Sequence, residues 1–391
     1  MSAIIAGYAR TPFVKANGQF ASVPATVLGA AAVTGALKDA GIRPEDVDFV
    51  YAGQVLQGGA GQNPARQTAV GAGIPLSVPA ATVNAVCLSG MEAVIQGTRL
   101  IASGEAQVVV AVGQESMTLA PHVWVGARGG KKFGAVELLD TMEHDGLSDA
   151  FDRISMGIST EDYNGPLNLS REDQDALAAA SHQRAAAAIE AGTFSEIVPV
   201  DVPARGGSVT VDTDDGVRPE TTVETLAKLR PAFREGGTIT AGSASQISDG
   251  AAAVVLVSPE WAAANGVAGI ARVLAHSFVA GPDTSLQAQP ANAITAALAK
   301  TDYEVGDLAS VEINEAFAAV GLHSARLLGV DLEKVNPHGG AIALGHPIGA
   351  SGARLVGHLA QTLSATGPGS VGAAALCGGG GQGTAVVLEA I

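Results

Sequence analysis

The chain has few cysteines, few aromatic side chains and few charged residues for its length. Its 391 residues include 2 Cys, and only 4% are aromatic and 15% are charged, whereas about 25% of residues are charged in an average soluble protein. Cys87 and Cys377 lie far apart in the sequence. Two such thiols exclude a disulfide-rich framework, and without histidine partners they are too few for a zinc site. We therefore expect two free thiols and no metal.

Long apolar runs and an excess of basic residues are also missing. No stretch of about 18 apolar residues occurs, so we predict no membrane-spanning helix and no membrane partner. The net charge is −16 and there is no basic stripe, which argues against a nucleic-acid partner. The first seven residues indicate a strand and lack the positively charged region of a signal peptide, so we expect a cytoplasmic protein.

Glycine and small apolar residues are abundant instead. Glycine occurs 50 times, and 47% of the residues are hydrophobic. Strand-like apolar runs alternate with helical patterns, which predicts an α/β fold with right-handed crossovers. Both ends of the chain show the same order of elements, with Ser89-Gly90 before one helix and Ser351-Gly352 before another. This order predicts two copies of one α/β unit.

The middle of the chain, roughly residues 118–247, departs from this alternation. A helix is expected after Ser170, because serine is a favoured N-cap residue. Residues 198–211 alternate apolar and polar side chains, which predicts a hairpin that turns at Asp214-Asp215-Gly216 with its aspartates in solvent. We interpret this region as an insertion.

Cys87 is a candidate nucleophile. It lies in residues 84–90, where a strand pattern changes to a helix pattern. The free N–H groups and the dipole at a helix N-terminus favour the thiolate, which is the nucleophilic form. The alternative is a buried structural cysteine.

His346 is a candidate general base in the glycine- and proline-rich stretch 336–352. An imidazole with an ordinary pKa near 6.5 suits proton transfer at neutral pH, and the alternative is a core histidine bonded to a carbonyl. His338 in the same stretch offers the same chemistry without a second supporting feature.

A second thiol and an asparagine complete the candidate set. Cys377 begins the run Cys-Gly-Gly-Gly-Gly-Gln-Gly, where glycines let backbone N–H groups converge on a substrate oxygen. Asn314 follows a predicted strand and could orient a water or an imidazole. A nucleophile, a base and an oxyanion site suit acyl transfer. The second thiol could supply the base that carbon–carbon bond formation needs at an α-carbon.

Taken together, these segments resemble the thiolase family over essentially the whole chain. The matching stretches are residues 59–67, 84–90, 113–117, 144–150, 314–317, 339–352 and 377–383. The resemblance implies an α/β thiolase fold with two similar βαβαβαββ halves in a five-layer α/β/α/β/α arrangement and an inserted loop domain. It implies three parts: an N-terminal thiolase domain (1–117 plus 248–268), a loop domain that binds coenzyme A (118–247), and a C-terminal thiolase domain (269–391).

The resemblance also implies roles for single residues. Cys87 would be the nucleophile that carries the acyl group. His346 would activate Cys87 and donate to the thioester oxygen of the second substrate, where Asn314 would hold a water. Cys377 would take and return the α-proton. The backbone N–H groups of Cys87 and Gly379 would form the oxyanion hole of the acyl-enzyme.

Three further positions are implied to bind substrate. Ser245 and Arg218 would contact coenzyme A, and Met156 would line the acyl site. The acyl-CoA and coenzyme A would be substrates, with no separate cofactor. The family resemblance further implies a homotetramer built as a dimer of dimers, with residues 121–141 as its tetramer contact.

The motifs look most like the acetoacetyl-CoA branch of the family, which implies acetyl-CoA C-acetyltransferase activity: reversible Claisen condensation of two acetyl-CoA to acetoacetyl-CoA and coenzyme A. A degradative 3-ketoacyl-CoA thiolase acting on longer chains is the alternative. An inactive scaffold or lipid-binding protein with the same fold would need Cys87, His346 or Cys377 to be replaced. A ketoacyl synthase is disfavoured by Cys377.

The chain departs from the branch at one place. The branch carries a Met-Gly-x-Gly-Pro stretch that faces the acyl group, whereas residues 281–290 read Gly-Pro-Asp-Thr-Ser-Leu-Gln-Ala-Gln-Pro. A buried Met contributes about 1.5–3 kcal/mol, so this difference leaves the acyl chain length open.

Overall fold

The computed structural model describes residues 3–391. Its N-terminal half repeats strand and helix in the order β-α-β-α-β-α-β-β. These elements are β1 (Ile4–Arg10), α1 (Ala25–Ala40), β3 (Phe49–Gly53), α2 (Pro64–Gly71), β4 (Ala80–Val83), α3 (Ser89–Ala102), β5 (Val108–Glu115) and β10 (Ser248–Val257). The short β2 (Val14–Lys15) pairs with β10, and α7 (Pro259–Asn265) leads into the second half.

The C-terminal half follows almost the same order. Its elements are β11 (Ala271–Ala280), α8 (Gln289–Leu298), β12 (Leu308–Ile313), α9 (Ala318–Leu328), α10 (Ala341–Leu344), α11 (Ser351–Thr366), β13 (Val371–Gly378) and β14 (Gln382–Ala390). The position equivalent to β4 is reduced to one parallel bridge between Val311 and Val335. The two predicted α/β units are therefore present.

The strands of both halves join in one sheet. The order is β12-β13-β14-β11-β1-β10-β5-β3-β4. The halves meet at β1 and β11, which pair only through Ile4–Arg272 and Ile5–Ala271. The β3–β4, β3–β5 and β12–β13 pairs are parallel, and the other pairs along this order are antiparallel.

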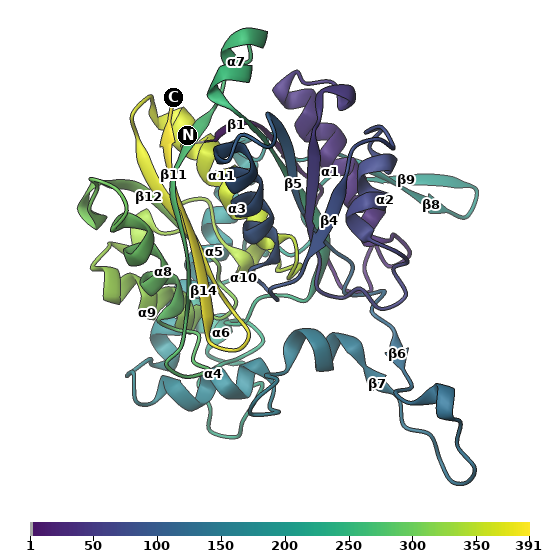
Figure 1. Cartoon of the computed structure of the whole chain (residues 1–391). Helices are drawn as coiled ribbons and strands as arrows, with labels where there is room; N and C mark the ends of the chain where they lie inside the picture. The colour runs from purple at the N-terminus through teal and green to yellow at the C-terminus, as the bar shows by residue number, and fades with distance from the viewer. Residues whose placement is uncertain (1–2) are drawn as a thin grey trace.

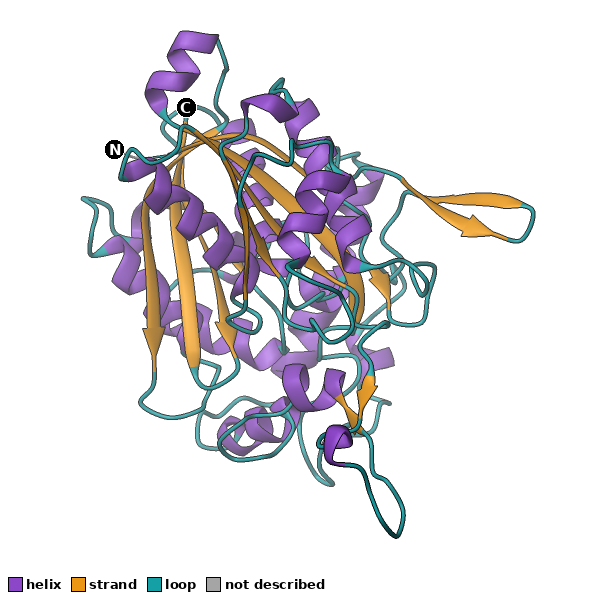
Figure 2. Cartoon of the chain, turned by 45° about the vertical axis from the view of Figure 1, so that its right-hand side comes forward, coloured by secondary structure: helices purple, strands orange, loops and turns teal. Residues whose placement is uncertain are grey.

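Helices divide the molecule into layers (Figures 1 and 2). Helices α1 and α2 pack on the outer side of the N-terminal strands, α8 packs on the outer side of the C-terminal strands, and α3 and α11 pack against each other between them. Three apolar cores fill these layers. This is the five-layer arrangement that the family resemblance implies.

The two Ser-Gly pairs explain how α3 and α11 meet. A Cβ atom at Gly90 would lie 2.7 Å from the carbonyl oxygen of Gly349, and one at Gly352 would overlap the backbone nitrogen of Met91. Only glycine permits backbones to approach this closely. The N-termini of both central helices, and the loops that precede them, are thereby brought together.

The segment between β5 and β10 contains the insertion. Its elements are β6 (His122–Val123), β7 (Leu139–Asp140), α4 (Met156–Asn164), α5 (Arg171–Glu190), β8 (Val200–Ala204), β9 (Gly207–Val211) and α6 (Val223–Leu226). The predicted N-cap is present, because the Ser170 side chain accepts a hydrogen bond from the Asp173 amide at 3.0 Å. The part around β6 and β7 projects from the body of the molecule (Figure 1).

The predicted turn of the inserted hairpin is wrong. Strands β8 and β9 do pair, but they turn at Arg205-Gly206. Asp214 is buried and forms a bidentate ion pair with Arg10 at 2.7 and 2.8 Å. Arg10 also binds buried Glu196 at 3.1 Å. The aspartate anchors the insertion to the N-terminal half, and an interaction so distant in sequence leaves no local pattern.

No helix among residues 3–391 is both long and apolar enough to cross a membrane.

Candidate active site

Cys87 lies on a tight turn between β4 and α3. Val86, just before it, has φ = 52°, a left-handed conformation that costs a β-branched residue about 1–3 kcal/mol. Ser89 holds the turn: its hydroxyl accepts from the Ala85 amide at 2.9 Å and donates to the Val86 carbonyl at 2.6 Å. Strain that the structure maintains in this way is concentrated at functional sites.

The thiol of Cys87 faces two backbone amides. Burial raises its pKa to about 12, while hydrogen bonds from the Cys87 and Gly379 amides lower it. The expectation of a lowered pKa is therefore wrong for the free protein, because burial outweighs the helix N-terminus. The two amides that meet at the sulfur are those that the resemblance implies for the oxyanion hole.

His346 lies between α10 and α11 and is 5% exposed. Burial, with a smaller effect of Arg354, lowers its pKa to about 3, so the expected pKa near 6.5 is wrong and the imidazole is neutral at neutral pH. Its Nδ1 is 2.6 Å from the Ser351 hydroxyl, which is also 3.0 Å from the Pro347 carbonyl. Ser351 can donate to either group, so it supports both neutral tautomers.

Asn314 is buried directly beside His346. Its side-chain nitrogen lies 3.3 Å from Nε2 of the imidazole, and its backbone N–H donates to the Ala375 carbonyl on β13 at 3.0 Å. Its side-chain oxygen is buried without a partner among the described residues. An unpaired buried acceptor has a free-energy cost that a water or substrate donor would remove.

Cys377 lies near the end of β13 and is 1% exposed. Burial raises its pKa, and the negative charge of a Cys87 thiolate would raise it further. Gly379 to Gly381 form the turn into β14, where Gly380 and Gly381 have φ of 79° and 67°. A Cβ at Gly379 would lie 3.5 Å from Val86 and 3.9 Å from the Met156 sulfur. The Cys87 turn, the glycine turn and α4 therefore meet.

A cavity of about 230 Å³ opens onto this site. Met156, Ser245 and His346 all line it, with Phe317 and Ile348 among its apolar walls. The backbone amide of Ser245 donates to the Ala316 carbonyl at 3.0 Å, which ties residues 244–245 to the Asn314 loop. The structure therefore brings Met156 and Ser245 to the same pocket as His346.

Arg218 lies further out, in a separate cavity of about 310 Å³. Its backbone amide donates to His182 Nδ1 at 3.2 Å, and burial lowers the His182 pKa to about 4. A groove lined by residues 229–236 and 241 shares Phe233 with the inner cavity and Leu229 and Ala241 with the Arg218 cavity. The three hollows are therefore neighbours that lie between Arg218 and His346.

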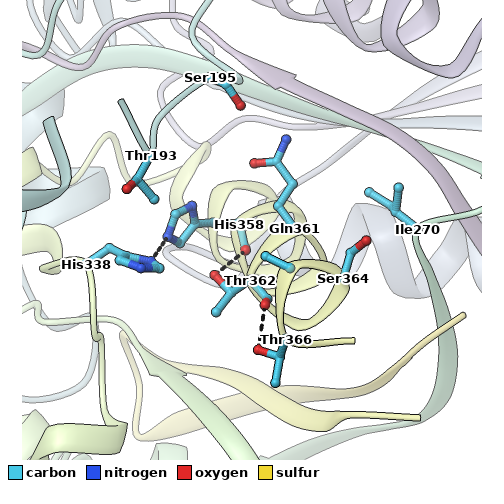
Figure 3. A pocket seen from close by; sticks show the side chains of 10 residues that line it. Thr193, Ser195, Ile270, His338, His358, Gln361, Thr362, Ser364 and Thr366 are labelled. Carbon is cyan, nitrogen blue, oxygen red and sulfur yellow. Dashed lines mark hydrogen bonds between the residues drawn. The ribbon is translucent and has the colours of Figure 1, made fainter. Parts of the chain in front are cut away.

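His338 does not join this site. It lines another cavity of about 630 Å³ beside the C-terminal half of α11, shown in Figure 3. Its Nδ1 is hydrogen-bonded to Nε2 of His358 at 3.0 Å, and His358 Nδ1 faces Glu196 at 3.6 Å. His338 therefore belongs to a buried polar network away from Cys87.

Two buried glutamates near the site are not predicted by the sequence motifs, although both belong to stretches that match the family. Glu315 accepts from Asn336 at 2.8 Å, Ser181 at 2.6 Å and the Ile342 amide at 3.1 Å, and burial raises its pKa. Glu115 accepts hydrogen bonds from three backbone N–H groups. A carboxylate that holds distant backbone has no local sequence signal.

No cluster of three or more His, Cys, Asp or Glu side chains suited to a metal ion occurs within the described part of the chain. Two thiols, a neutral imidazole and the backbone N–H groups beside Cys87 are groups that can carry out acyl chemistry.

Comparisons with known proteins agree with this geometry. Residues 3–260 match the thiolase N-terminal domain and residues 267–390 match the thiolase C-terminal domain. A probable acetyl-CoA acetyltransferase of Mycobacterium tuberculosis is 53% identical over 100% of this chain and 99% of that protein. The acetyl-CoA acetyltransferase of Pseudomonas aeruginosa is 48% identical over 98% of each chain. The crystal structure of the Bacillus anthracis acetyl-CoA acetyltransferase superposes with a TM-score of 0.96 at 36% identity, covering 100% of this chain and 99% of that one. The chain belongs to the thiolase family.

Proposed function

We propose that this thiolase is an acetyl-CoA C-acetyltransferase that condenses two acetyl-CoA reversibly to acetoacetyl-CoA and coenzyme A. The observation that supports it most is that the Cys87 turn meets the glycine turn after Cys377, where a Cβ atom at Gly379 would lie 3.5 Å from Val86. The backbone N–H groups of Cys87 and Gly379 lower the pKa of the Cys87 thiol, and a negative charge on Cys87 raises that of Cys377. The full-length relatives named acetyl-CoA acetyltransferase add support. The condensation needs only CoA thioesters and protein groups, so we propose no cofactor.

The first half-reaction transfers an acetyl group to Cys87. The sulfur attacks the thioester carbon while Nε2 of His346 takes its proton. Because the free thiol is weakly acidic and the imidazole weakly basic, proton transfer must accompany formation of the carbon–sulfur bond. The two amides hold the oxyanion. The bond to coenzyme A then breaks, and the departing thiolate takes the proton of Cys377.

The second half-reaction forms the carbon–carbon bond. The thioester oxygen of a second acetyl-CoA faces the protonated Nε2 of His346 and the Asn314 site. Cys377, now a thiolate, removes the α-proton, and the enolate carbon attacks the acetyl carbon on Cys87. The bond to Cys87 breaks, and its sulfur regains the proton from His346. Cys377 keeps the α-proton, which restores both thiols.

The neighbouring hollows suit a long, flexible substrate. The pantetheine arm would run through the apolar cavity beside Met156 and Ser245, and the nucleotide end would lie near Arg218. Arg218 is exposed, and guanidinium groups bind phosphates well. Coenzyme A would thus connect the insertion to the catalytic loops.

Leu286 lies in the stretch that departs from the acetoacetyl-CoA branch. It is 3% exposed and belongs to the apolar cluster that contains Cys377, Phe317 and Met156. A branched apolar side chain here would close the floor of the acyl pocket. We therefore propose that Leu286 restricts the acyl group to a short chain.

The chain-length preference tests both the activity and this restriction. In thiolysis with coenzyme A, we expect the highest kcat/KM on acetoacetyl-CoA and a fall for 3-ketoacyl-CoA of six to sixteen carbons. Leu286→Ala should raise the ratio of kcat/KM for the six-carbon substrate to kcat/KM for the four-carbon substrate by about 10-fold, since one methylene is worth about 1–3 kcal/mol in discrimination. Leu327→Ala, on an exposed face of α9, is the control. A flat or rising profile in the unaltered protein would favour the degradative thiolase.

The projecting segment around β6 and β7 is proposed as the contact of a tetramer. It exposes Trp124 (38%), Val125 (70%), Phe133 (94%) and Leu138 (57%), an apolar surface that is costly in water. Changing Val125, Phe133 and Leu138 together to Ser should halve the mass in sedimentation at equilibrium from four chains to two. Val209→Ser, which alters an exposed apolar residue on β9, should leave the mass unchanged. A tetramer that survives the triple change would refute this contact.

A further inference from the structure

Glu115 joins the two halves of the molecule beside the catalytic loops. It ends β5 and is fully buried. One carboxylate oxygen accepts from the Leu56 amide at 3.1 Å, and the other accepts from the amides of Val55 at 3.0 Å and Gly349 at 2.9 Å. Val55 and Leu56 follow β3 in the N-terminal half, whereas Gly349 lies in the C-terminal half between His346 and α11.

The contact to Gly349 depends on close approach of backbone. A Cβ atom at Gly349 would lie 2.7 Å from a carboxylate oxygen of Glu115, 2.7 Å from the Gln114 carbonyl and 3.1 Å from Cα of Gln54. No side chain fits there. The carboxylate therefore reaches a backbone amide of the His346 loop because that position is glycine.

The groups held by Glu115 surround the catalytic residues. Val55, Leu56 and Ile348 belong to one apolar cluster, against which Cys87 packs. Gly349 lies two residues before Ser351, whose hydroxyl contacts His346. One carboxylate thus fixes a wall beside Cys87 and the loop that carries His346.

The three amides are the partners of this carboxylate, since no salt bridge to Glu115 occurs within residues 3–391. Burial raises its pKa to about 7, against the effect of the three amides, and the nearby carboxyl of Asp249 raises it as well. Its negative charge also disfavours the thiolate of Cys87. Above pH 7 this carboxyl is charged beside a nucleophile whose ionisation it opposes, and that cost needs a compensating benefit.

We propose that Glu115 is a positioning residue that holds His346 and the wall beside Cys87 in register across the two halves of the site. This inference rests on the proposed thiolase reaction for its meaning in catalysis. The placement itself follows from the three amide contacts. The opposing charge gives the role a signature: its removal should make Cys87 more reactive while catalysis becomes slower.

Glu115→Gln tests the proposal, because the amide keeps the shape but offers a single acceptor oxygen. Its NH2 group must face either the N–H group of Leu56 or those of Val55 and Gly349, and a donor that faces a donor forms no hydrogen bond. We expect kcat for thiolysis of acetoacetyl-CoA to fall by about 10²-fold, the usual effect of a misplacement of about 1 Å. KM for coenzyme A should change little, since Arg218 and Ser245 are elsewhere. Glu115→Asp keeps the charge, but its shorter side chain cannot reach all three amides. We therefore expect its kcat to be lowered as well.

Two readouts do not depend on turnover. Alkylation of Cys87 by iodoacetamide at about pH 9, where Glu115 is ionised, should accelerate by about twofold to tenfold in Glu115→Gln, because a neighbouring negative charge has been removed. Hydrogen exchange of peptides that contain Val55, Leu56 and Gly349 should accelerate as well. Glu92→Gln, which alters a buried carboxylate bonded to Gln96 and Arg99 on α3, should match the unaltered protein in every assay.

The outcomes separate this inference from the proposed function. Unchanged kcat, alkylation and exchange in Glu115→Gln would overturn the positioning role. Slower turnover with unchanged alkylation and unchanged exchange at these amides would also overturn it, as would equal losses in Glu92→Gln. An unaltered protein without thiolysis would refute the proposed function, while exchange and alkylation would still decide whether Glu115 positions these loops.

Discussion

Cys87→Ala should abolish thiolysis of acetoacetyl-CoA, with a loss of at least about 10⁴-fold in kcat. Removal of a nucleophile eliminates the covalent route, and the remaining groups of such a site then act on their own. In this protein, the two amides at the Cys87 sulfur would remain in place without an atom to attack the thioester. Incubation with acetyl-CoA followed by intact-mass spectrometry should show an acetyl adduct on the unaltered chain and none on the variant.

Unfolding in urea and a matched control variant distinguish a lost nucleophile from a lost fold. Alanine is smaller than cysteine and Cys87 packs at the edge of its cluster, so we expect the variant to unfold at a similar urea concentration. Cys377→Ala should still acquire the adduct at Cys87, which makes it the matched control. An adduct on Cys87→Ala that maps to Cys377 would reverse the assignment of the two thiols.

The arrangement of the site could be predicted from sequence because its positions repeat. The Ser-Gly pairs at 89–90 and 351–352 begin equivalent helices, and those helices meet where glycine allows it. Strand and helix periodicity places Cys87, Asn314 and His346 in loops and Cys377 at the end of a strand, and these placements depend on local patterns alone. That the four residues share one site is what the family resemblance implies.

Acidity and charge pairing could not be predicted in this way. The helix N-terminus at Cys87 predicts an acidic thiol, but burial raises its pKa to about 12. The ordinary pKa of His346 predicts a base, but burial lowers it to about 3. Desolvation depends on the neighbours that close around a group, and a sequence motif does not specify them. The hairpin pattern predicts Asp214 in solvent for the same reason, since its partner Arg10 lies 204 residues earlier in the chain.

Cys377→Ala should separate the two half-reactions. The variant should acquire an acetyl group at Cys87 but fail to exchange the α-protons of acetyl-CoA with solvent, with a loss of about 10²–10⁴-fold, the usual contribution of a general base. Proton NMR in D₂O measures this exchange directly. Asn314, His346 and the oxyanion amides remain in the variant, so binding of acetyl-CoA should be retained.

The order of the two half-reactions follows from the proton that Cys377 must lose. Burial raises the pKa of Cys377, so in the free enzyme it is a protonated thiol and cannot act as a base. In the proposed reaction the coenzyme A thiolate that leaves during acetylation of Cys87 takes this proton, so Cys377 becomes a thiolate only in the acetyl-enzyme. Exchange of α-protons by the unaltered enzyme should therefore require the acetyl-enzyme, and Cys87→Ala should exchange as slowly as Cys377→Ala. Rapid exchange in Cys87→Ala would show that Cys377 acts as a base without acylation, and normal exchange in Cys377→Ala would remove it from that role.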